Sequence, residues 1–372
     1  MKFSRSRVCP ILLAAAYLTL QCAPAMKAKP PKRKPAPVPE SLETSKRGDN
    51  DARDGRLKEF QLITATLERA YSYLQIKQKR WRFSYSQLKS TYEKRLSELK
   101  GMKDYRNLLR EFLGHFKDGH LRINYPRAGS QPGSTQMAPA ISHRWVGHGI
   151  LLTRIARLWG DEKAIAKGLN EGLTKLKSAR ALIVDLRGNG GGNDALVLDY
   201  ISKIVPRRIP LGRVSLRLSP EVLGQRPHYK RLYQPDPSRP GYSLWLPLFV
   251  EPQTKTGFSG PIAVLIDKAC YSSCETAALA FRVSQVATLY GQATGGGSAN
   301  PIFIKLPRGG KMMVPTWIHR VPGGKLLEDN GIAPHTVLKP TVNADKIATI
   351  NLRQKLERPR CGSECPSTMI KE

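Results

Sequence analysis

Acidic residues are scarce in this sequence. The chain of 372 residues has 29 Asp and Glu against 61 Lys and Arg, which gives a formal net charge of +32 at pH 7. Such an excess favours non-specific contact with anionic surfaces, although Lys and Arg scattered along the whole chain are also typical of a solvated basic surface. The sequence also lacks the usual nucleic-acid-binding motifs, so we expect no specific nucleic acid partner.

Long apolar runs are lacking as well. The N-terminal run Ile11–Leu20 is too short to span a bilayer as a stable helix. It follows a basic segment at residues 2–7 and precedes the small-residue pattern APA at 23–25, which signal peptidase requires. This order predicts a signal peptide over residues 1–25 and an exported protein, either periplasmic or extracellular. Cys22 leaves the alternative of a lipoprotein.

Cysteine is also rare, and two of the six cysteines lie in the predicted signal peptide. The others are Cys270, Cys274, Cys361 and Cys365. In an oxidising compartment four thiols predict two disulfides, with three possible pairings. Cys270 and Cys274 are close enough in sequence to bridge, and pairing with the C-terminal two is equally allowed. A zinc site is the weaker alternative, because zinc sites favour two-residue spacings between cysteines. We therefore expect no metal and no other cofactor.

Composition and periodicity divide the chain into segments. Residues 26–56 are rich in proline and charge, which predicts a disordered linker. Leucines and aromatic residues at steps of three and four then predict a small helical domain over residues 57–126. Strand-like apolar segments alternate with helical patterns over residues 140–345, which predicts an α/β core. Residues 346–372 are read as a polar tail that carries the last cysteine pair.

Two adjacent serines, Ser272 and Ser273, lie between a predicted strand (262–267) and a predicted helix (275–286). A hydroxyl at such a junction lies near the positive end of a helix, the general setting of a strand–turn–helix nucleophile. Ser272 and Glu275 also fit the spacing of a capping box, so the same turn allows a purely structural interpretation. The pattern GxSxG is missing, which excludes an ordinary α/β-hydrolase.

A glycine run, GNGGG, follows the buried strand ALIVDL at residues 181–186. Glycines between a strand and a helix let backbone N–H groups approach an anion closely, and turn formation alone is the alternative. The spacing is not GxGxxG, so the run is not a dinucleotide-binding fingerprint. His120 attracts notice by its place at the junction of the helical domain and the α/β core. A zinc-type HExxH pair is absent.

Five segments together resemble a known family. KDGH, ALIVDLRGNGGGN, AVLIDKACYSSCETAALA, YGQATGGG and LEDNGIAPH follow in the order and spacing of the tail-specific (C-terminal processing) serine proteases, most closely their tricorn-core and retinoid-binding-protein-like branch. The resemblance covers about residues 60–341. It implies a crotonase- and ClpP-like α/β sandwich preceded by a helical bundle. It also implies an endopeptidase that hydrolyses unfolded or C-terminal polypeptide segments through an acyl-enzyme. Fewer than thirty residues separate His120 from the strand near residue 150, too few for the PDZ domain of many members.

The resemblance assigns roles residue by residue. The family nucleophile lies three residues before the glutamate of an S-x-x-E segment, which is Glu275 here, so Ser272 is the nucleophile. His120 matches the general base, and Glu328 matches the acid that assists it. The oxyanion hole is implied to consist of the N–H of Ser273 and an N–H of Gly190 or Gly191.

The sequence also departs from the family. Gly297 stands where the Ser–Lys branch has its lysine, which excludes that dyad. Gly119 stands where tricorn-like members can have a serine that links the histidine to the glutamate, so Asp118 is an alternative partner for orienting His120. The competing hypothesis is a catalytically silent binding protein on the same fold, retained on anionic surfaces by its basic charge.

Overall fold

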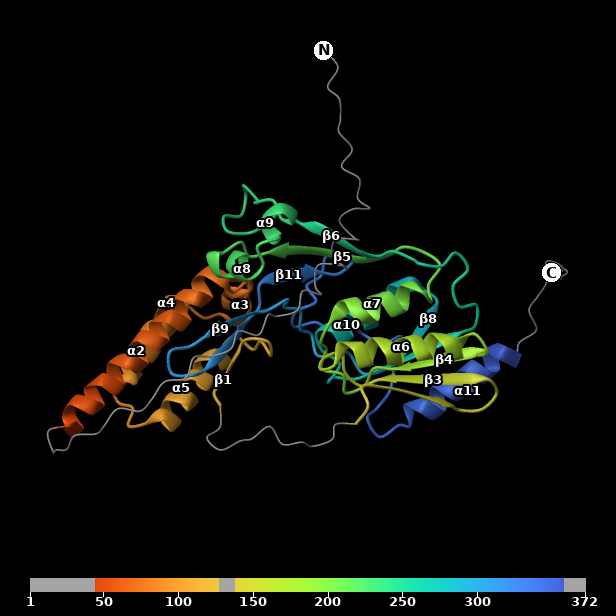
Figure 1. The fold of residues 1–372 in the computed structure, drawn as a ribbon, viewed down its shortest axis with the longest axis horizontal. Helices are drawn as coiled ribbons and strands as arrows, with labels where there is room; N and C mark the ends of the chain where they lie inside the picture. The colour runs from red at the N-terminus through yellow and green to blue at the C-terminus, as the bar shows by residue number, and fades with distance from the viewer. Residues whose placement is uncertain (1–43, 127–137, 358–372) are drawn as a thin grey trace, which may run out of the picture. The chain divides into compact units, whose positions relative to one another are not determined.

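The computed structural model describes residues 44–126 and 138–357, with side chains from residue 53 onward (Figure 1). The chain divides into two compact units, and several segments of the chain contribute to each. The first unit contains residues 44–126, 212–248 and 297–329, and the second contains residues 138–211, 249–296 and 330–357. The fold class is mixed α/β, with a helical N-terminal region, as the sequence predicts.

The first unit begins with four helices. These are α2 (Thr44–Ala70), α3 (Leu74–Trp81), α4 (Tyr85–Leu96) and α5 (Met102–Gly114). Helix α2 starts at Thr44, inside the segment expected to be a linker, because a helix nucleated by the amphipathic part of its sequence extends at little cost. The predicted leucine and aromatic stripes form the core, where Phe60, Phe112 and Phe116 are fully buried. The periodicity therefore correctly predicted helices packed through apolar faces.

Two small antiparallel sheets complete the first unit. One has the order β1-β10-β9 and is formed by β1 (Arg122–Asn124), β10 (Lys311–Val314) and β9 (Ile302–Lys305). The other has the order β11-β5-β6 and is formed by β11 (Trp317–Arg320), β5 (Ile209–Leu216) and β6 (Leu246–Val250). Two short helices, α8 (Pro220–Gln225) and α9 (Tyr229–Leu232), lie in the segment between β5 and β6.

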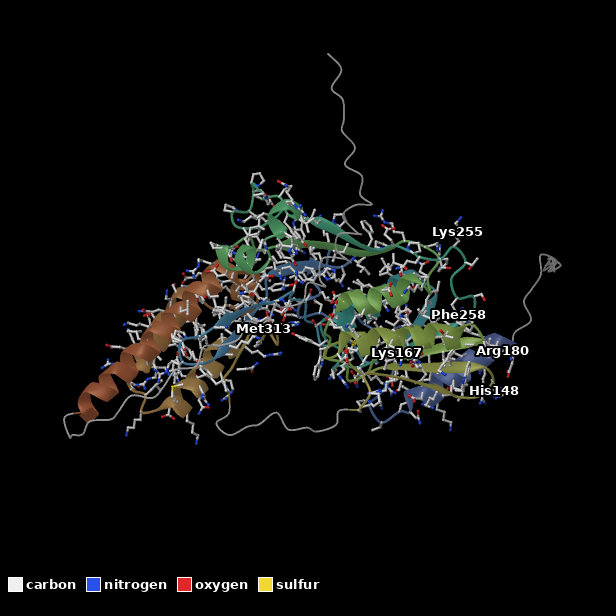
Figure 2. All side chains as sticks on the ribbon, viewed as in Figure 1. His148, Lys167, Arg180, Lys255, Phe258 and Met313 are labelled. Carbon is white, nitrogen blue, oxygen red and sulfur yellow. A yellow bond between two sulfur atoms is a disulfide. The ribbon has the colours of Figure 1, made fainter. Side chains whose placement is uncertain are left out.

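The second unit is built on a six-stranded sheet with the order β12-β8-β7-β4-β3-β2. Its strands are β2 (Ile141–Trp145), β3 (Ile150–Ile155), β4 (Ala181–Asp185), β7 (Ile262–Ile266), β8 (Ala287–Gly291) and β12 (Thr336–Val337). All neighbours are parallel except β2, which pairs antiparallel with β3 at one edge. The loop between β2 and β3 carries the exposed His148 (Figure 2). Parallel strands need cover on both faces, and this explains the continuous apolar runs of β4 and β7.

Helices provide that cover. On one face lie α6 (Glu162–Leu176), α7 (Asp194–Ser202) and α10 (Ser273–Ser284), and on the other lies α11 (Ala344–Glu357), as Figure 1 shows. Helix α11 contributes Ala344, Ala348 and Leu352 to the core beneath the sheet. It occupies the first part of the segment that the sequence suggested was a polar tail, because residues at steps of four (Ala344, Ala348 and Leu352) pack against the sheet while Ile350 stays exposed. Within residues 44–126 and 138–357, no helix combines the length and apolar character that a membrane crossing needs.

Strands β4 and β7 are neighbours and run parallel, so the loops that follow them emerge at the same edge of the sheet. The loop after β4 is the glycine run, and the loop after β7 is the serine turn. The N–H of Tyr271 donates to the carbonyl of Asn189 at 3.0 Å and joins the two loops directly. The fold thus brings together two motifs that lie about eighty residues apart in the sequence.

Candidate active site

The serine turn connects β7 to α10 and is held from both sides. The Asp267 carboxylate accepts the N–H groups of Ala269 and Cys270, each at 3.0 Å, and it also accepts the N–H of Gly188 from the glycine run. A disulfide joins Cys270 to Cys274 across the turn, with a Cα–Cα separation of 5.4 Å. This is one of the pairings that the sequence allowed; Cys361 and Cys365 lie outside the described residues. No group of three potential metal-ligating side chains is found in the described part of the chain.

Ser272 itself has a strained backbone. Its φ is 58° and its ψ is −125°. Residues other than glycine rarely adopt this backbone conformation, which costs about 1–3 kcal/mol. Its N–H donates to the Glu275 carboxylate at 3.2 Å, the reciprocal contact expected of a capping box. Glu275 is fully buried and also accepts the Thr294 hydroxyl at 2.5 Å and the Gly296 N–H at 2.8 Å. One carboxylate therefore ties the strained turn to the loop after β8.

The two serines differ in how their hydroxyls are used. Ser273 is buried, and its hydroxyl donates to the carbonyl of Gly192 at 2.8 Å and also contacts the Asp194 carboxylate. Burial raises the pKa of Asp194 above its ordinary value. Ser272 is only half-buried. Of the two, Ser272 has the hydroxyl that a substrate can reach, because Ser273 is committed to holding the helix start against α7.

The glycine run packs directly against this turn. A Cβ built on Gly191, whose φ is 96°, lies 2.7 Å from the Ser272 Cβ and 3.0 Å from the Ser273 nitrogen. The Gly191 N–H donates to the Asn189 side-chain oxygen at 2.8 Å and is therefore occupied. By contrast, no acceptor within the described residues is found for the N–H of Gly190 or of Ser273. Gly190 is the glycine with an available donor, and Gly191 is the one that permits the close approach.

The His120 segment belongs to the first unit and follows α5. One oxygen of the Asp118 carboxylate accepts the backbone N–H of His120 at 2.9 Å and of Leu121 at 3.3 Å, and the other accepts the Tyr71 hydroxyl at 2.8 Å. Asp118 therefore holds the backbone of the turn. His120 is 5% exposed. Its burial, with a smaller contribution from the Arg122 charge, lowers the pKa of His120 to about 3, which keeps the imidazole neutral.

Glu328 also belongs to the first unit and is buried among polar partners. Its carboxylate accepts the Lys77 ammonium at 2.7 Å and the backbone N–H of Ser298 at 3.1 Å. Lys77 is fully buried and also donates to the Asp329 carboxylate at 2.6 Å. Burial, together with the nearby Asp118 carboxylate, raises the pKa of Glu328 to about 8, and Lys77 acts in the opposite direction.

Lys77 is the residue that sequence reasoning missed. The helical stripe was interpreted as core, and Lys77 occupies a position of that stripe, three residues after Leu74 and four before Trp81. A lysine at a core position of an amphipathic helix signals a buried partner of opposite charge. That signal was available in the sequence, but the identity of the partner was not, because Glu328 lies 251 positions away.

The candidate residues thus fall into two groups. Within the second unit, Ser272, Ser273, Gly190 and Gly191 lie together in two joined loops. Within the first unit, His120 lies on the turn that Asp118 holds, and Glu328 is paired with Lys77.

Comparison with known proteins defines the class. Residues 151–338, half of the chain, match the model of peptidase family S41. The chain belongs to this family of serine-type peptidases, which are hydrolases that act on polypeptides. The resemblance to tail-specific, C-terminal processing proteases is confirmed.

Several solved structures share the fold. A lipoprotein from Streptococcus agalactiae has a TM-score of 0.56 at 18% identity, over 81% of this chain and 96% of that one. Mature CPAF has a TM-score of 0.61 at 12% identity, over 82% of this chain and 96% of that one. The tricorn protease has a TM-score of 0.55 at 14% identity, over 82% of this chain and 37% of its own. No curated protein matches the sequence.

Proposed function

We propose that this peptidase is exported and cleaves unfolded or C-terminal polypeptide segments through an acyl-enzyme on Ser272. His120 acts as the general base, and Glu328 assists it. The observation that carries the proposal is the serine turn: a half-buried hydroxyl on a strained strand–turn–helix junction, beside two backbone N–H groups without an acceptor within the described residues. Strain of this kind persists only where surrounding contacts hold it, and it is common at functional sites.

The chemical steps follow from these groups. The Ser272 oxygen attacks the carbonyl carbon of the scissile peptide bond, and its proton passes to His120. The negative charge that develops on the carbonyl oxygen is stabilised by the N–H groups of Ser273 and Gly190. His120 then gives the proton to the leaving amine. A water molecule, deprotonated by His120, hydrolyses the ester and restores the Ser272 hydroxyl.

Glu328 assists His120 in this cycle, and Lys77 holds the Glu328 side chain in place. A neutral, buried imidazole is the form that a general base requires. Its protonation during the reaction creates a buried cation, which is costly unless a carboxylate stabilises it. Lys77 and the Ser298 N–H fix the orientation of the Glu328 carboxyl group and oppose the rise in its pKa that burial causes, so its carboxylate form is available as the pH approaches 8. We assign Lys77 as a positioning residue for Glu328.

Export is supported by the order of basic, apolar and small residues before residue 26. The Cys270–Cys274 disulfide is consistent with an oxidising compartment.

Labelling with a fluorophosphonate probe, followed by peptide mapping, tests the function. We expect the probe to modify Ser272 and a casein substrate to be hydrolysed. Ser272→Ala is expected to lose both signals, and Ser273→Ala is the matched control that keeps the label on Ser272. Absence of labelling in the wild-type protein, or labelling that survives in Ser272→Ala, contradicts the proposal. Absence together with salt-sensitive retention on anionic lipid vesicles supports the silent binding protein instead.

A further inference from the structure

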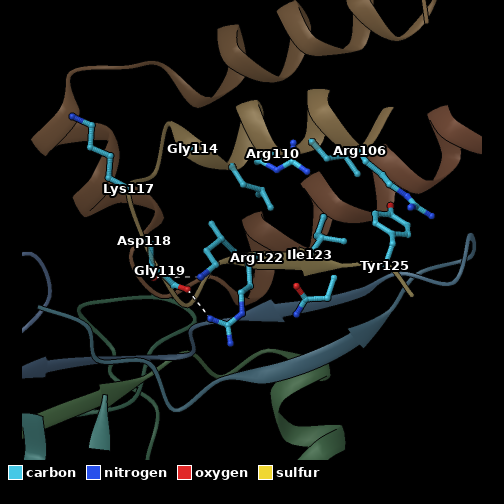
Figure 3. Close-up of a pocket in the computed structure, with 13 residues that line it drawn as sticks. Arg106, Arg110, Gly114, Lys117, Asp118, Gly119, Arg122, Ile123 and Tyr125 are labelled. Atoms are coloured by element: carbon cyan, nitrogen blue, oxygen red, sulfur yellow. Dashed lines mark hydrogen bonds between the residues drawn. The ribbon is translucent and has the colours of Figure 1, made fainter. Parts of the chain in front are cut away.

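A cavity of about 700 Å³ lies in the first unit between α5 and β1 (Figure 3). One face of α5 contributes residues spaced three and four positions apart, namely Arg106, Leu109, Arg110, Leu113 and Gly114. The turn at residues 117–121 and the strand with Tyr125 form the rest of the lining. We call this cavity the α5–β1 groove. Part of its wall is the turn that carries His120.

Three arginines that line the groove have no carboxylate partner. Arg106, Arg110 and Arg122 form no ion pair with any described residue. Arg106 stacks over the Tyr125 ring at 4.8 Å, and its Nε is buried without a hydrogen-bond acceptor among the described residues. Figure 3 shows Arg106 and Arg110 on the helix and Arg122 on the strand.

Their hydrogen bonds go only to neutral oxygens. Arg110 donates to the Asn107 amide oxygen at 2.8 Å, and Arg122 donates to the Gly119 carbonyl at 3.2 Å. A guanidinium whose only acceptors are neutral retains its full attraction for an anion. The ammonium of Lys117 does not add to this set, because it lies 3.9 Å from the centre of the Trp81 ring.

The carboxylates around the groove are already engaged elsewhere. Asp118 is 7% exposed and accepts the Tyr71 hydroxyl and two backbone N–H groups. Glu59 is fully buried and accepts the Tyr125 hydroxyl and the Arg308 N–H. Glu111, on α5 itself, pairs with Arg95 at 2.8 Å. None of these three carboxylates lies within 4.0 Å of a guanidinium nitrogen of Arg106, Arg110 or Arg122, so no ion pair among the described residues neutralises the arginines of the groove.

We infer that the α5–β1 groove binds an acidic segment of the polypeptide substrate, outside the peptide bond that is cleaved. This inference rests on the proposed function and adds a substrate preference to it. Arginines bind carboxylates, and the half-buried Ile123 side chain in the lining suits an apolar part of a peptide. Strand β1 is also an edge of its sheet, so its outer backbone groups can pair with an extended chain. A single-stranded nucleic acid instead favours aromatic stacking platforms, and Tyr125 is the only aromatic side chain in this lining.

Peptide binding to the full-chain Ser272→Ala protein tests the groove without requiring turnover. The probes are two fluorescent peptides of the same length, one rich in Glu and the other with Gln at each of those positions. We expect the Glu peptide to bind about tenfold more tightly, and its affinity to fall as NaCl rises from about 0.05 M to about 0.5 M. In Arg110→Glu/Arg122→Glu the affinity ratio is expected to fall to about one. Lys103→Glu, an exposed change on α5 outside the groove, is expected to keep the ratio.

Equal binding of both peptides by the Ser272→Ala protein overturns the inference. It is also overturned if Lys103→Glu lowers the ratio of the two peptide affinities as much as the double arginine variant does. Tighter binding of a single-stranded oligonucleotide than of the Glu peptide, lost in the double variant, also overturns it in favour of nucleic acid. The two proposals fail separately. If the Glu peptide binds selectively but the fluorophosphonate probe does not label Ser272, the proposed catalytic mechanism is refuted and the proposed peptide-binding role of the groove stands. If the probe labels Ser272 but the Glu peptide does not bind selectively, the groove's role is refuted and the catalytic mechanism stands.

Discussion

The buried ammonium of Lys77 shows how much one side chain decides in the first unit. It is fully buried and bridges the carboxylates of Glu328 and Asp329 at 2.7 and 2.6 Å. A buried charge of this kind is tolerated only with a partner, so each member of the network depends on the others. The same dependence makes the network sensitive to single substitutions.

Replacing Lys77 with Met leaves the Glu328 carboxylate buried without its cation. We expect Lys77→Met to lower the free energy of unfolding by about 3–5 kcal/mol, measured by urea denaturation. The matched control is Lys79→Met on the exposed side of the same helix, with an expected change within about 0.5 kcal/mol. Lys77→Met/Glu328→Gln is expected to recover part of the loss. Equal stability of Lys77→Met and wild type contradicts the role given to this network.

At the level of secondary-structure elements, two loops at the same sheet edge form the nucleophile region. The glycine run follows β4 and the serine turn follows β7, and both loops lie at the same edge of the sheet because the two strands are parallel. The sequence predicted both strands and both loops, because periodicity and glycine content are local signals. It left open whether Gly190 or Gly191 supplies a donor, because that depends on the contact of Gly191 with Asn189.

Gly191→Ala tests how closely these loops must approach. The new Cβ meets the Ser272 Cβ at 2.7 Å, so the turn must shift. We expect kcat/KM for peptide hydrolysis to fall about hundredfold, the loss typical of a disturbed oxyanion hole. Gly160→Ala is the matched control, because Gly160 also has a positive φ of 109° but nothing within 4 Å of a Cβ. It is expected to cost some stability and no activity, and equal loss in both variants refutes the contact argument.

For the whole molecule, the buried ionisable groups set how stability depends on pH. Burial lowers the pKa of His120 from 6.5 to about 3, so the folded state resists a proton that the unfolded state accepts. The stability contributed by His120 is therefore present above pH 6.5 and is lost as the pH falls toward 3. Glu328, whose pKa is raised to about 8, contributes in the opposite direction: its stability is present below pH 4.5 and is lost as the pH rises through 8.

Urea denaturation between pH 6.5 and pH 4.5, compared between the wild-type protein and His120→Gln, isolates the histidine, because the Glu328 contribution is common to both proteins. Relative to His120→Gln, the wild-type protein is expected to lose up to about 1.4 kcal/mol of unfolding free energy per pH unit over this range. His148→Asn is the matched histidine substitution away from the site, because His148 is exposed in the loop between β2 and β3. If the unfolding free energies of His120→Gln and of the wild-type protein change in parallel with pH, His120 has the same pKa in the folded and unfolded states, and the prediction is wrong.

The order of short motifs along the chain was enough, by itself, to determine the family, the α/β class and the strand–turn–helix that carries Ser272. These features depend on residues close in sequence, whose turn and periodicity preferences are local. The tertiary structure decided the matters that depend on distant partners. In the folded chain the Ser273 hydroxyl contacts Gly192 and Asp194. Cys270 forms a disulfide with Cys274, and Glu328 forms an ion pair with the Lys77 ammonium. Hydrogen bonds and ion pairs between distant segments form only when the chain is packed, so no local pattern specifies which partners meet.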